Sequence, residues 1–299
     1  MIRLAVRVRR DHAEIVLAEL LELVPAGVEE VALSGEQVEY AVYGAPGELP
    51  GLPDLDAVAG DALVEVSTSQ VPDDWRERWR EFHRPVLIDA PAAQDGVPAL
   101  HVRPPWEAPS PLPPGRVHEI VIDPGQAFGT GAHATTRLCL ELLLALCAEV
   151  ASGAALLDVG TGSGVLAIAA SLLGFRPVLG LDIEPESVAA ARQNAAANRV
   201  EVEILRLDLR AAAAPAVALP WIGGGARPQA PIVITANLLR PLLLELAHRT
   251  DHAPAHLIAG GMLVAEADEV AAAFAARLGM RERARREQGE WAALWLSGG

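Results

Sequence analysis

The sequence predicts an α/β protein in which a small unit of mixed strands and helices precedes a larger, doubly wound parallel sheet. From about residue 119, apolar runs of strand length alternate with helical segments, which is the pattern of a parallel sheet. Before residue 70, strands and helices instead follow the order βαββαβ. With 299 residues, of which 51% are hydrophobic and 21% charged, the chain is long enough for about two domains, and a wholly disordered chain is excluded.

Residues 1–70 are expected to form a ferredoxin-like α+β domain. Alternating apolar side chains mark its strands, and an amphipathic run with helical spacing marks its first helix. In chain order the segments are strand 2–8, helix 11–24, strands 28–35 and 37–44, a weaker helix, and strand 63–71. The region has four Arg against thirteen Asp and Glu. This charge either forms an acidic face that docks a basic partner or is simply a soluble acidic surface.

Residues 71–118 are expected to link the two domains. The stretch 73–85 has helical character and carries Trp75 and Trp79, which lie four residues apart and therefore share one face of a helix. We expect this pair to pin the linker against a domain, with stacking on a ligand as the alternative. Further along, the run APSPLPPG is rich in proline, as in semi-rigid spacers.

Residues 119–299 are expected to form the doubly wound sheet. Strands are expected at 155–159, 177–182, 202–208, 231–238 and 256–263, and helices at 165–173, 184–198, 238–249 and 266–279. Pro185 suits the first turn of a helix, and Asn198 suits its end. The last two strands form a hairpin across Gly289. A parallel sheet finished by an antiparallel hairpin fits the methyltransferase variant of the Rossmann-like fold better than the dehydrogenase variant.

A glycine loop follows the first strand of this sheet. Gly160, Gly162 and Gly164 form a GxGxG pattern, in which the missing side chains let the backbone turn sharply and approach a ligand closely. A dinucleotide fingerprint requires its third glycine where Val165 stands. Asp158 precedes the loop and would repel a pyrophosphate but attract the cationic aminoacyl and sulfonium end of S-adenosylmethionine. The loop therefore predicts S-adenosylmethionine as the cofactor.

Two further aspartates end the next two expected strands. Asp182 lies where a carboxylate accepts hydrogen bonds from both hydroxyls of a ribose, and Asp208 lies where the adenine would border the sheet. Each aspartate taken alone is equally well explained as a helix cap. Three aspartates at successive strand ends, above a glycine loop, favour a nucleoside site.

Candidates for the chemistry lie at Asn237 and His133. Asn237 follows an apolar strand, where its amide and neighbouring carbonyls would orient an incoming amine, although a helix cap explains it locally as well. His133 is a candidate helper base, but a single histidine before a helix is more often structural. Thr135 and Thr136 stand at the start of the same expected helix, where hydroxyls cap backbone amides or contact a ligand.

The composition excludes several functions. All 24 basic residues are Arg, so Schiff-base catalysis by lysine, a lysine-anchored pyridoxal phosphate and a Walker-type phosphate loop are excluded. A net charge of −15 argues against direct binding of nucleic acid. The start of the chain lacks a signal-peptide core and no apolar run reaches a membrane span, while the two cysteines have the spacing of a buried helix. We therefore expect a protein of the cytoplasm.

No metal is expected. His248, His252 and His256 recur every four residues, which on an uninterrupted helix would align three metal ligands. Pro254 interrupts that helix, so a solvated loop is the better interpretation.

Four segments resemble the PrmA family, the methyltransferases of large-subunit ribosomal protein eleven. They are DPGQAFGTGAHATT, LLDVGTGSGVLAIAA, GLDIEPESVAAARQNAAAN and ANLLRPLLLELA. The resemblance implies a class I methyltransferase domain behind a substrate-recognition domain. It also implies that Thr136, Gly160, Asp182 and Asn237 bind S-adenosylmethionine. The implied activity is methylation of lysine ε-amines and an N-terminal α-amine of that ribosomal protein. We expect the protein to be a monomer.

The chain departs from the family pattern in three places. Ala134 stands where the family usually has proline, and Gln126 where it has an apolar residue. An expanded stretch at 211–230, rich in alanine, proline and glycine, is predicted to be a flexible surface loop. The run AGGML replaces the typical SGIL.

Two alternative functions remain open from the sequence. One is methylation of another protein or of a small molecule. Glutamine methyltransferases of release factors have NPPY where this chain has NLLR, which counts against that substrate. The other is a non-catalytic module that binds the cofactor and docks on the ribosome.

Overall fold

The computed structural model divides the chain into two compact units, Met1–Phe82 and His83–Gly299. The residues that it describes are 2–13, 16–17, 20, 29–32, 37–44, 49, 60–70, 83–89, 97–113, 115–124, 133–150, 153–208, 232–250 and 252–298.

The first unit contains a four-stranded antiparallel sheet with the strand order β2-β3-β1-β4. Its strands are β1 (Ile2–Arg9), β2 (Glu29–Ala32), β3 (Gln37–Gly44) and β4 (Leu63–Gln70), with 3-10 turns η1 (Arg10–His12) and η2 (Gly60–Ala62). The four predicted strands are therefore confirmed. Most of the predicted helix at 11–24 lies outside the described residues, and the ferredoxin-like assignment stays a prediction.

The two faces of this sheet differ in chemistry. Alternate residues of β1 and β3 are buried on one face, where the hydroxyl of Tyr40 donates a 2.9 Å hydrogen bond to the carbonyl of Ala13. On the other face, the carboxylate of Glu39 accepts hydrogen bonds from Arg3 and Arg7. The hydrogen bond from Arg3 holds the pKa of Glu39 below its usual range. Arg3, Arg7 and Glu39 on this face are thus paired with one another.

The second unit is built on a seven-stranded sheet with the order β10-β9-β8-β11-β12-β14-β13. Its strands are β8 (Ala155–Val159), β9 (Val178–Asp182), β10 (Glu203–Arg206), β11 (Ile232–Asn237), β12 (His256–Leu263), β13 (Arg281–Gln288) and β14 (Trp291–Ser297). Pairing is parallel from β10 to β12 and antiparallel through β14 and β13. The predicted parallel sheet with a terminal hairpin is confirmed.

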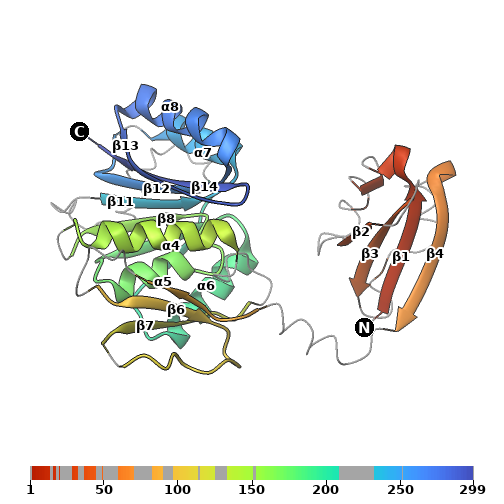
Figure 1. The fold of residues 1–299 in the computed structure, drawn as a ribbon, viewed down its shortest axis with the longest axis horizontal. Helices are drawn as coiled ribbons and strands as arrows, with labels where there is room; N and C mark the ends of the chain where they lie inside the picture. The colour runs from red at the N-terminus through yellow and green to blue at the C-terminus, as the bar shows by residue number, and fades with distance from the viewer. Residues whose placement is uncertain are drawn as a thin grey trace. The chain divides into compact units, whose positions relative to one another are not determined.

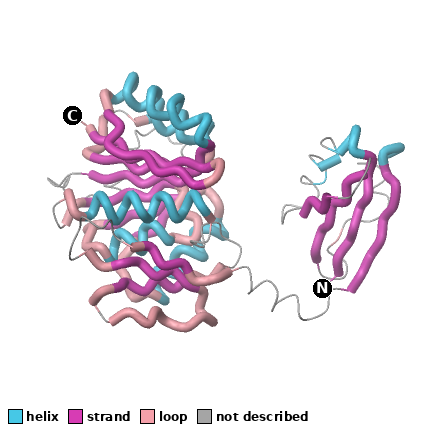
Figure 2. Tube along the Cα trace, viewed as in Figure 1, coloured by secondary structure: helices cyan, strands magenta, loops and turns pink. Residues whose placement is uncertain are grey.

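Helices cover both faces of this sheet (Figures 1 and 2). They are α4 (Ala134–Cys147), α5 (Val165–Leu172), α6 (Pro185–Ala197), α7 (Arg240–Arg249) and α8 (Ala267–Leu278), with the 3-10 turn η4 (Val264–Glu266) before α8. Residues of α4, α5 and α6 share one core cluster, and residues of α7 and α8 share the other. As predicted, α6 begins at Pro185 and is capped by Asn198.

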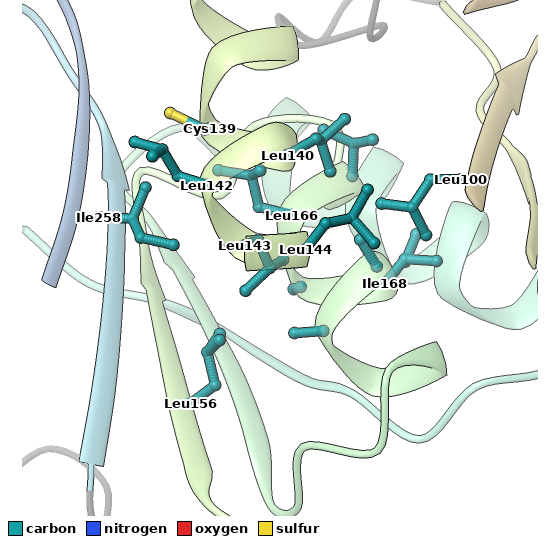
Figure 3. Packing of buried hydrophobic residues seen from close by; sticks show 14 of the residues in the cluster. Leu100, Cys139, Leu140, Leu142, Leu143, Leu144, Leu156, Leu166, Ile168 and Ile258 are labelled. Atoms are coloured by element: carbon teal, nitrogen blue, oxygen red, sulfur yellow. The ribbon is translucent and has the colours of Figure 1, made fainter. Parts of the chain in front are cut away.

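The largest apolar core surrounds α4. Ten of its fourteen residues are buried, and Figure 3 shows its leucines gathered between Ile258 of β12 and Leu100. Cys139 is fully buried and Cys147 is half-buried, which agrees with the predicted helical setting of both cysteines. No helix in the described parts of the chain is long and apolar enough to cross a membrane.

The predicted linker at 71–118 is wrong for its second half. Strands β5 (Val86–Ile88), β6 (Ala99–Arg103) and β7 (Val117–Val121) form a three-stranded sheet inside the second unit. Leu100, Val102 and Ile120 are buried against α4 and α5, so this segment covers part of the core instead of spanning between domains. The prolines of this segment lie mostly between its strands, and its high proline content led to the prediction of a linker instead of short strands. Trp75 and Trp79 lie outside the described residues, as does 211–230.

Asn194 of α6 and the C-cap residue Asn198 bind the backbone at the end of β7. The amide of Asn198 accepts the N–H of Val121 at 2.8 Å and donates to the carbonyl of the same residue at 2.7 Å. One turn earlier, Asn194 accepts the N–H of Asp123 at 3.1 Å and donates to the carbonyl of Ser163 at 2.9 Å. The end of β7 is therefore fixed to the helix that borders the glycine loop.

Candidate functional site

A cavity of about 380 Å³ lies at the carboxyl ends of the parallel strands. Ligands of doubly wound sheets bind at this edge, where the loops after the strands converge. The wall is mostly apolar. It is lined by Thr136, Val159, Gly160, Thr161, Gly162, Val165, Leu166, Leu181, Asp182, Ile183, Ser187, Leu207, Asp208, Asn237, Leu238 and Leu242. Six of the predicted site residues are among them, namely Thr136, Gly160, Gly162, Asp182, Asp208 and Asn237.

The glycine loop forms one wall because its backbone adopts left-handed conformations. Gly160 has a φ of +70° and Gly162 a φ of +53°, values that residues with a Cβ rarely adopt. A Cβ at Gly160 would lie 2.3 Å from the side chain of Leu238. The missing side chain therefore lets Leu238 pack directly on the loop at the cavity wall.

Asp182 presents its carboxylate to the cavity from the end of β9. One carboxylate oxygen accepts the N–H of Gly162 at 2.8 Å, and the other accepts the N–H of Glu184 at 3.0 Å. An ionised carboxylate has about four acceptor positions, so both oxygens keep capacity for a ligand. This geometry suits a vicinal diol, whose two hydroxyls donate to the two oxygens of one carboxylate. Asp208 lies on the same wall, just beyond β10.

Asn237 ends β11, which flanks β8 and its glycine loop on the side opposite to β9 and Asp182. Its Nδ2 donates a 3.2 Å hydrogen bond to the hydroxyl of Thr136 in α4. Its Oδ1 is buried and has no hydrogen-bond partner within the described structure. A buried acceptor without a partner costs stability unless a ligand supplies the donor. The site therefore offers one strong acceptor for a ligand N–H.

Asp158 does not line the cavity, contrary to its predicted role as a cofactor contact. It is only 1% exposed and lies beneath the loop, where the hydroxyls of Thr161 and Thr235 donate to its carboxylate at 2.7 and 2.6 Å. Burial raises the pKa of Asp158 to about 6. The carboxylate thus ties the loop to β11 from below.

Replacing Asp158 with asparagine is expected to change how stability depends on pH. The folded pKa of about 6 lies above the unfolded value of about 3.9. The stability that this carboxyl contributes is therefore fully present below pH 4 and is lost as the pH rises through 6, by roughly 3 kcal/mol in total and about 2 kcal/mol between pH 4 and pH 7. Urea unfolding of wild type and Asp158→Asn at pH 4 and pH 7 tests this. The free energy of unfolding of the wild type, relative to that of Asp158→Asn, should be lower at pH 7 than at pH 4. The same difference at both pH values would contradict a raised pKa for Asp158.

Gly164 and His133 also lie away from the cavity wall. Gly164 has a φ of +84° at the start of α5, and a Cβ there would lie 3.1 Å from that of Ala191, so its role is close packing of α5 on α6. His133 caps α4, with its Nδ1 accepting the N–H of Thr135 at 3.3 Å. The ring of His133 also packs edge-on against Trp291, with centroids 5.1 Å apart.

The described residues hold no group of three His, Cys, Asp or Glu side chains arranged to bind a metal ion. His248 lies in α7, which ends at Arg249, whereas His256 begins β12 and accepts a hydrogen bond from the indole N–H of Trp295. The regular spacing of the histidines therefore does not place them on one helix.

Sequence reasoning missed the supports behind the wall. The hydroxyls of Thr161 and Thr235 hold Asp158. Thr235 lies in β11, 77 residues from Asp158, so no local pattern reveals that second contact. Leu238 and Leu242 close the cavity from the α7 side. Their position next to Asn237 was the available signal, but apolar residues at a helix start are ordinarily assigned to the core.

The parallel sheet, its glycine loop and the antiparallel hairpin at the edge together define a class I methyltransferase fold. The chain belongs to the family described as "Ribosomal protein L11 methyltransferase (PrmA)", whose model matches residues 54–297.

Relatives and a solved structure agree with this assignment. The ribosomal protein L11 methyltransferase of Syntrophotalea carbinolica is 37% identical over 90% of this chain and 78% of its own length. That of Citrifermentans bemidjiense is 39% identical over 64% of this chain, which spans only 55% of the relative. The crystal structure of ribosomal protein L11 methylase from Lactobacillus delbrueckii subsp. bulgaricus is 27% identical. It matches with a TM-score of 0.53 over 71% of this chain and 98% of that protein.

Proposed function

We propose that this protein transfers methyl groups from S-adenosylmethionine to lysine ε-amines and to the N-terminal α-amine of ribosomal protein L11. The observation that carries the proposal is the family match over residues 54–297, joined to a cavity whose polar groups suit a nucleoside and an amine. Bound S-adenosylmethionine supplies an activated methyl group on a positively charged sulfur.

The cavity residues fit this cofactor. Gly160 and Gly162 allow close approach of the ligand, Asp182 would accept the ribose hydroxyls, and Asp208 would border the adenine. The orphaned Oδ1 of Asn237 supports the fit, since the cofactor and the substrate both bring N–H donors. We propose that Thr136 belongs to the same binding wall. Asp158 would act only through the loop and through its charge.

The chemistry requires a neutral amine aligned with the methyl group. We propose that Oδ1 of Asn237 and nearby carbonyls hold the amine. Leu238 and Leu242 exclude water beside it, which disfavours the charged form of the amine. A lysine amine has a reference pKa of about 10.4, so this desolvation does the work that a dedicated base would otherwise do.

We propose that residues 1–70 form a ferredoxin-like domain that recognises the substrate. The antiparallel strand order β2-β3-β1-β4 supports this topology. The region carries nine more acidic than basic residues, which suits a basic ribosomal protein. We further propose that the protein acts as a cytoplasmic monomer and does not bind nucleic acid directly.

Intact-mass spectrometry of ribosomal protein L11 tests the function. After incubation with this protein and S-adenosylmethionine, the substrate should gain mass in steps of about 14 Da, one methylene each. Asp182→Ala serves as the binding-deficient control, and Asn237→Ala should turn over at least about tenfold more slowly at saturating cofactor.

Two outcomes would contradict the proposal. Cofactor binding without any mass step would favour another substrate or a binding role. Unchanged turnover in Asn237→Ala would remove that residue from the chemistry.

A further inference from the structure

We propose that His133 and Trp291 act together as positioning residues that fix the first turn of α4 and, through Thr136, the side chain of Asn237. The proposal rests on the function proposed above for Asn237. It assigns a role to two residues that do not line the cavity.

The chain of contacts starts at the C-terminal hairpin. Trp291 begins β14, where it pairs with Leu263 of β12 and with Gln288 of β13. The neighbouring carbonyl of Glu290 accepts the N–H of Val264 at 2.8 Å. Because β14 runs antiparallel to β12, its first residue lies at the same sheet edge as the end of β11. Trp291 is therefore anchored on both sides, near the cavity.

The second contact joins this anchor to α4. The rings of His133 and Trp291 meet edge to face, with centroids 5.1 Å apart and planes at 68°. This arrangement is a favourable one for two aromatic rings. His133 is the N-cap of α4, so the indole fixes the residue at which that helix begins.

The third contact links the ring of His133 to the first turn of α4. Nδ1 of His133 accepts the N–H of Thr135 and lies 2.8 Å from the hydroxyl of the same residue. Thr136 is the next residue and is fully buried, and its hydroxyl accepts a hydrogen bond from the side-chain Nδ2 of Asn237. A shift of the cap would therefore move the hydroxyl that holds the amide. An unpartnered Oδ1 on Asn237 has no second hydrogen bond to keep it in place.

This geometry also argues against His133 as the helper base considered from the sequence. Its Nδ1 lone pair is engaged by the helix, so the proton of the neutral ring lies on Nε2. A proton on Nδ1 would displace the N–H of Thr135 and break the cap. The residue is better suited to hold the helix than to move a proton.

Nuclear magnetic resonance of the side-chain amide of Asn237 tests the proposal without relying on turnover. The signals are assigned by their loss in Asn237→Asp. Trp291→Leu should displace or broaden them, and Trp291→Phe, which keeps an aromatic edge, should largely restore them. With ribosomal protein L11 as substrate, Trp291→Leu should lower kcat about tenfold or more with little change in KM.

Trp295 is a matched control. It lies four residues further along β14, roughly 13 Å away, and also packs edge-on against a histidine, His256. Trp295 is more deeply buried than Trp291, so Trp295→Leu should lower stability yet leave the Asn237 signals in place. Unmoved signals in Trp291→Leu, or equal movement in both variants, would overturn the proposal.

His133→Asn separates positioning from proton transfer. Asparagine is a strong N-cap but lacks the aromatic ring, so the Asn237 signals should move while the pH dependence of kcat keeps its shape. Loss of a limb of that pH profile would overturn the proposal in favour of a base. If Trp291→Leu does not fold, this variant carries the same spectroscopic test. Failure of the wild type to methylate ribosomal protein L11 would refute the proposed function alone, since the spectra need no substrate.

Discussion

Replacing Asp182 with alanine is expected to weaken binding of S-adenosylmethionine about hundredfold or more. The carboxylate lines the cavity with both oxygens already oriented by the N–H groups of Gly162 and Glu184. A hydrogen bond to a charged group is worth about 1.5–3 kcal/mol, and a ribose diol would make two. Isothermal titration calorimetry with the cofactor measures the loss directly.

Asp268→Ala is the control for this prediction. Asp268 is also an aspartate near a helix start, but its side chain is largely exposed and pairs with Arg285 on the surface. It should leave the affinity unchanged. A loss of less than about fivefold in Asp182→Ala would mean that the ribose is not held by this carboxylate.

Gly261→Ala is expected to destabilise the second unit by roughly 3 kcal/mol or more and to lower turnover. Gly261 has a φ of +84°, and a Cβ would lie 2.6 Å from the backbone carbonyl oxygen of Leu238. Backbone atoms cannot rotate aside as a side chain can. Leu238 directly follows Asn237, so relief of the contact would displace the residue that is proposed to hold the amine. Urea unfolding and steady-state kinetics together measure the two effects.

Gly279→Ala isolates the cost of the backbone conformation. Gly279 has a similar φ of +67° at the end of α8, but a Cβ there would have no neighbour within 4 Å. It should cost only about 1–2 kcal/mol and leave kcat unchanged. Equal destabilisation by the two variants would show that the steric contact with Leu238 adds nothing to the loss of stability in Gly261→Ala.

Most of the second unit was predictable because its signals are local. The strand 155–159 and the strand 256–263 have the bounds that their apolar runs predicted, and α6 begins at Pro185. Periodicity and helix caps depend on neighbours in the sequence. The short strands of 83–118 were not predictable in this way, since their burial depends on α4 and α5, which follow them in the chain.

The same distinction applies to the site. Asp182, Asp208 and Asn237 line the cavity, and each ends a strand or follows one within two residues, which the sequence marks. Asp158 has an equally clear position after an apolar run, but its side chain points below the loop to Thr161 and Thr235. Alternation of side chains along a strand predicts which face a residue occupies, but not what has been packed above it.

Asn194 has a mechanical consequence for the second unit. Its one amide group joins the backbone of the glycine loop, at Ser163, to the backbone that leaves β7, at Asp123. These segments lie about forty residues apart in the sequence and follow strands of different sheets. While both hydrogen bonds hold, motion of the loop at Ser163 is transmitted to the backbone at Asp123, so these two segments move together.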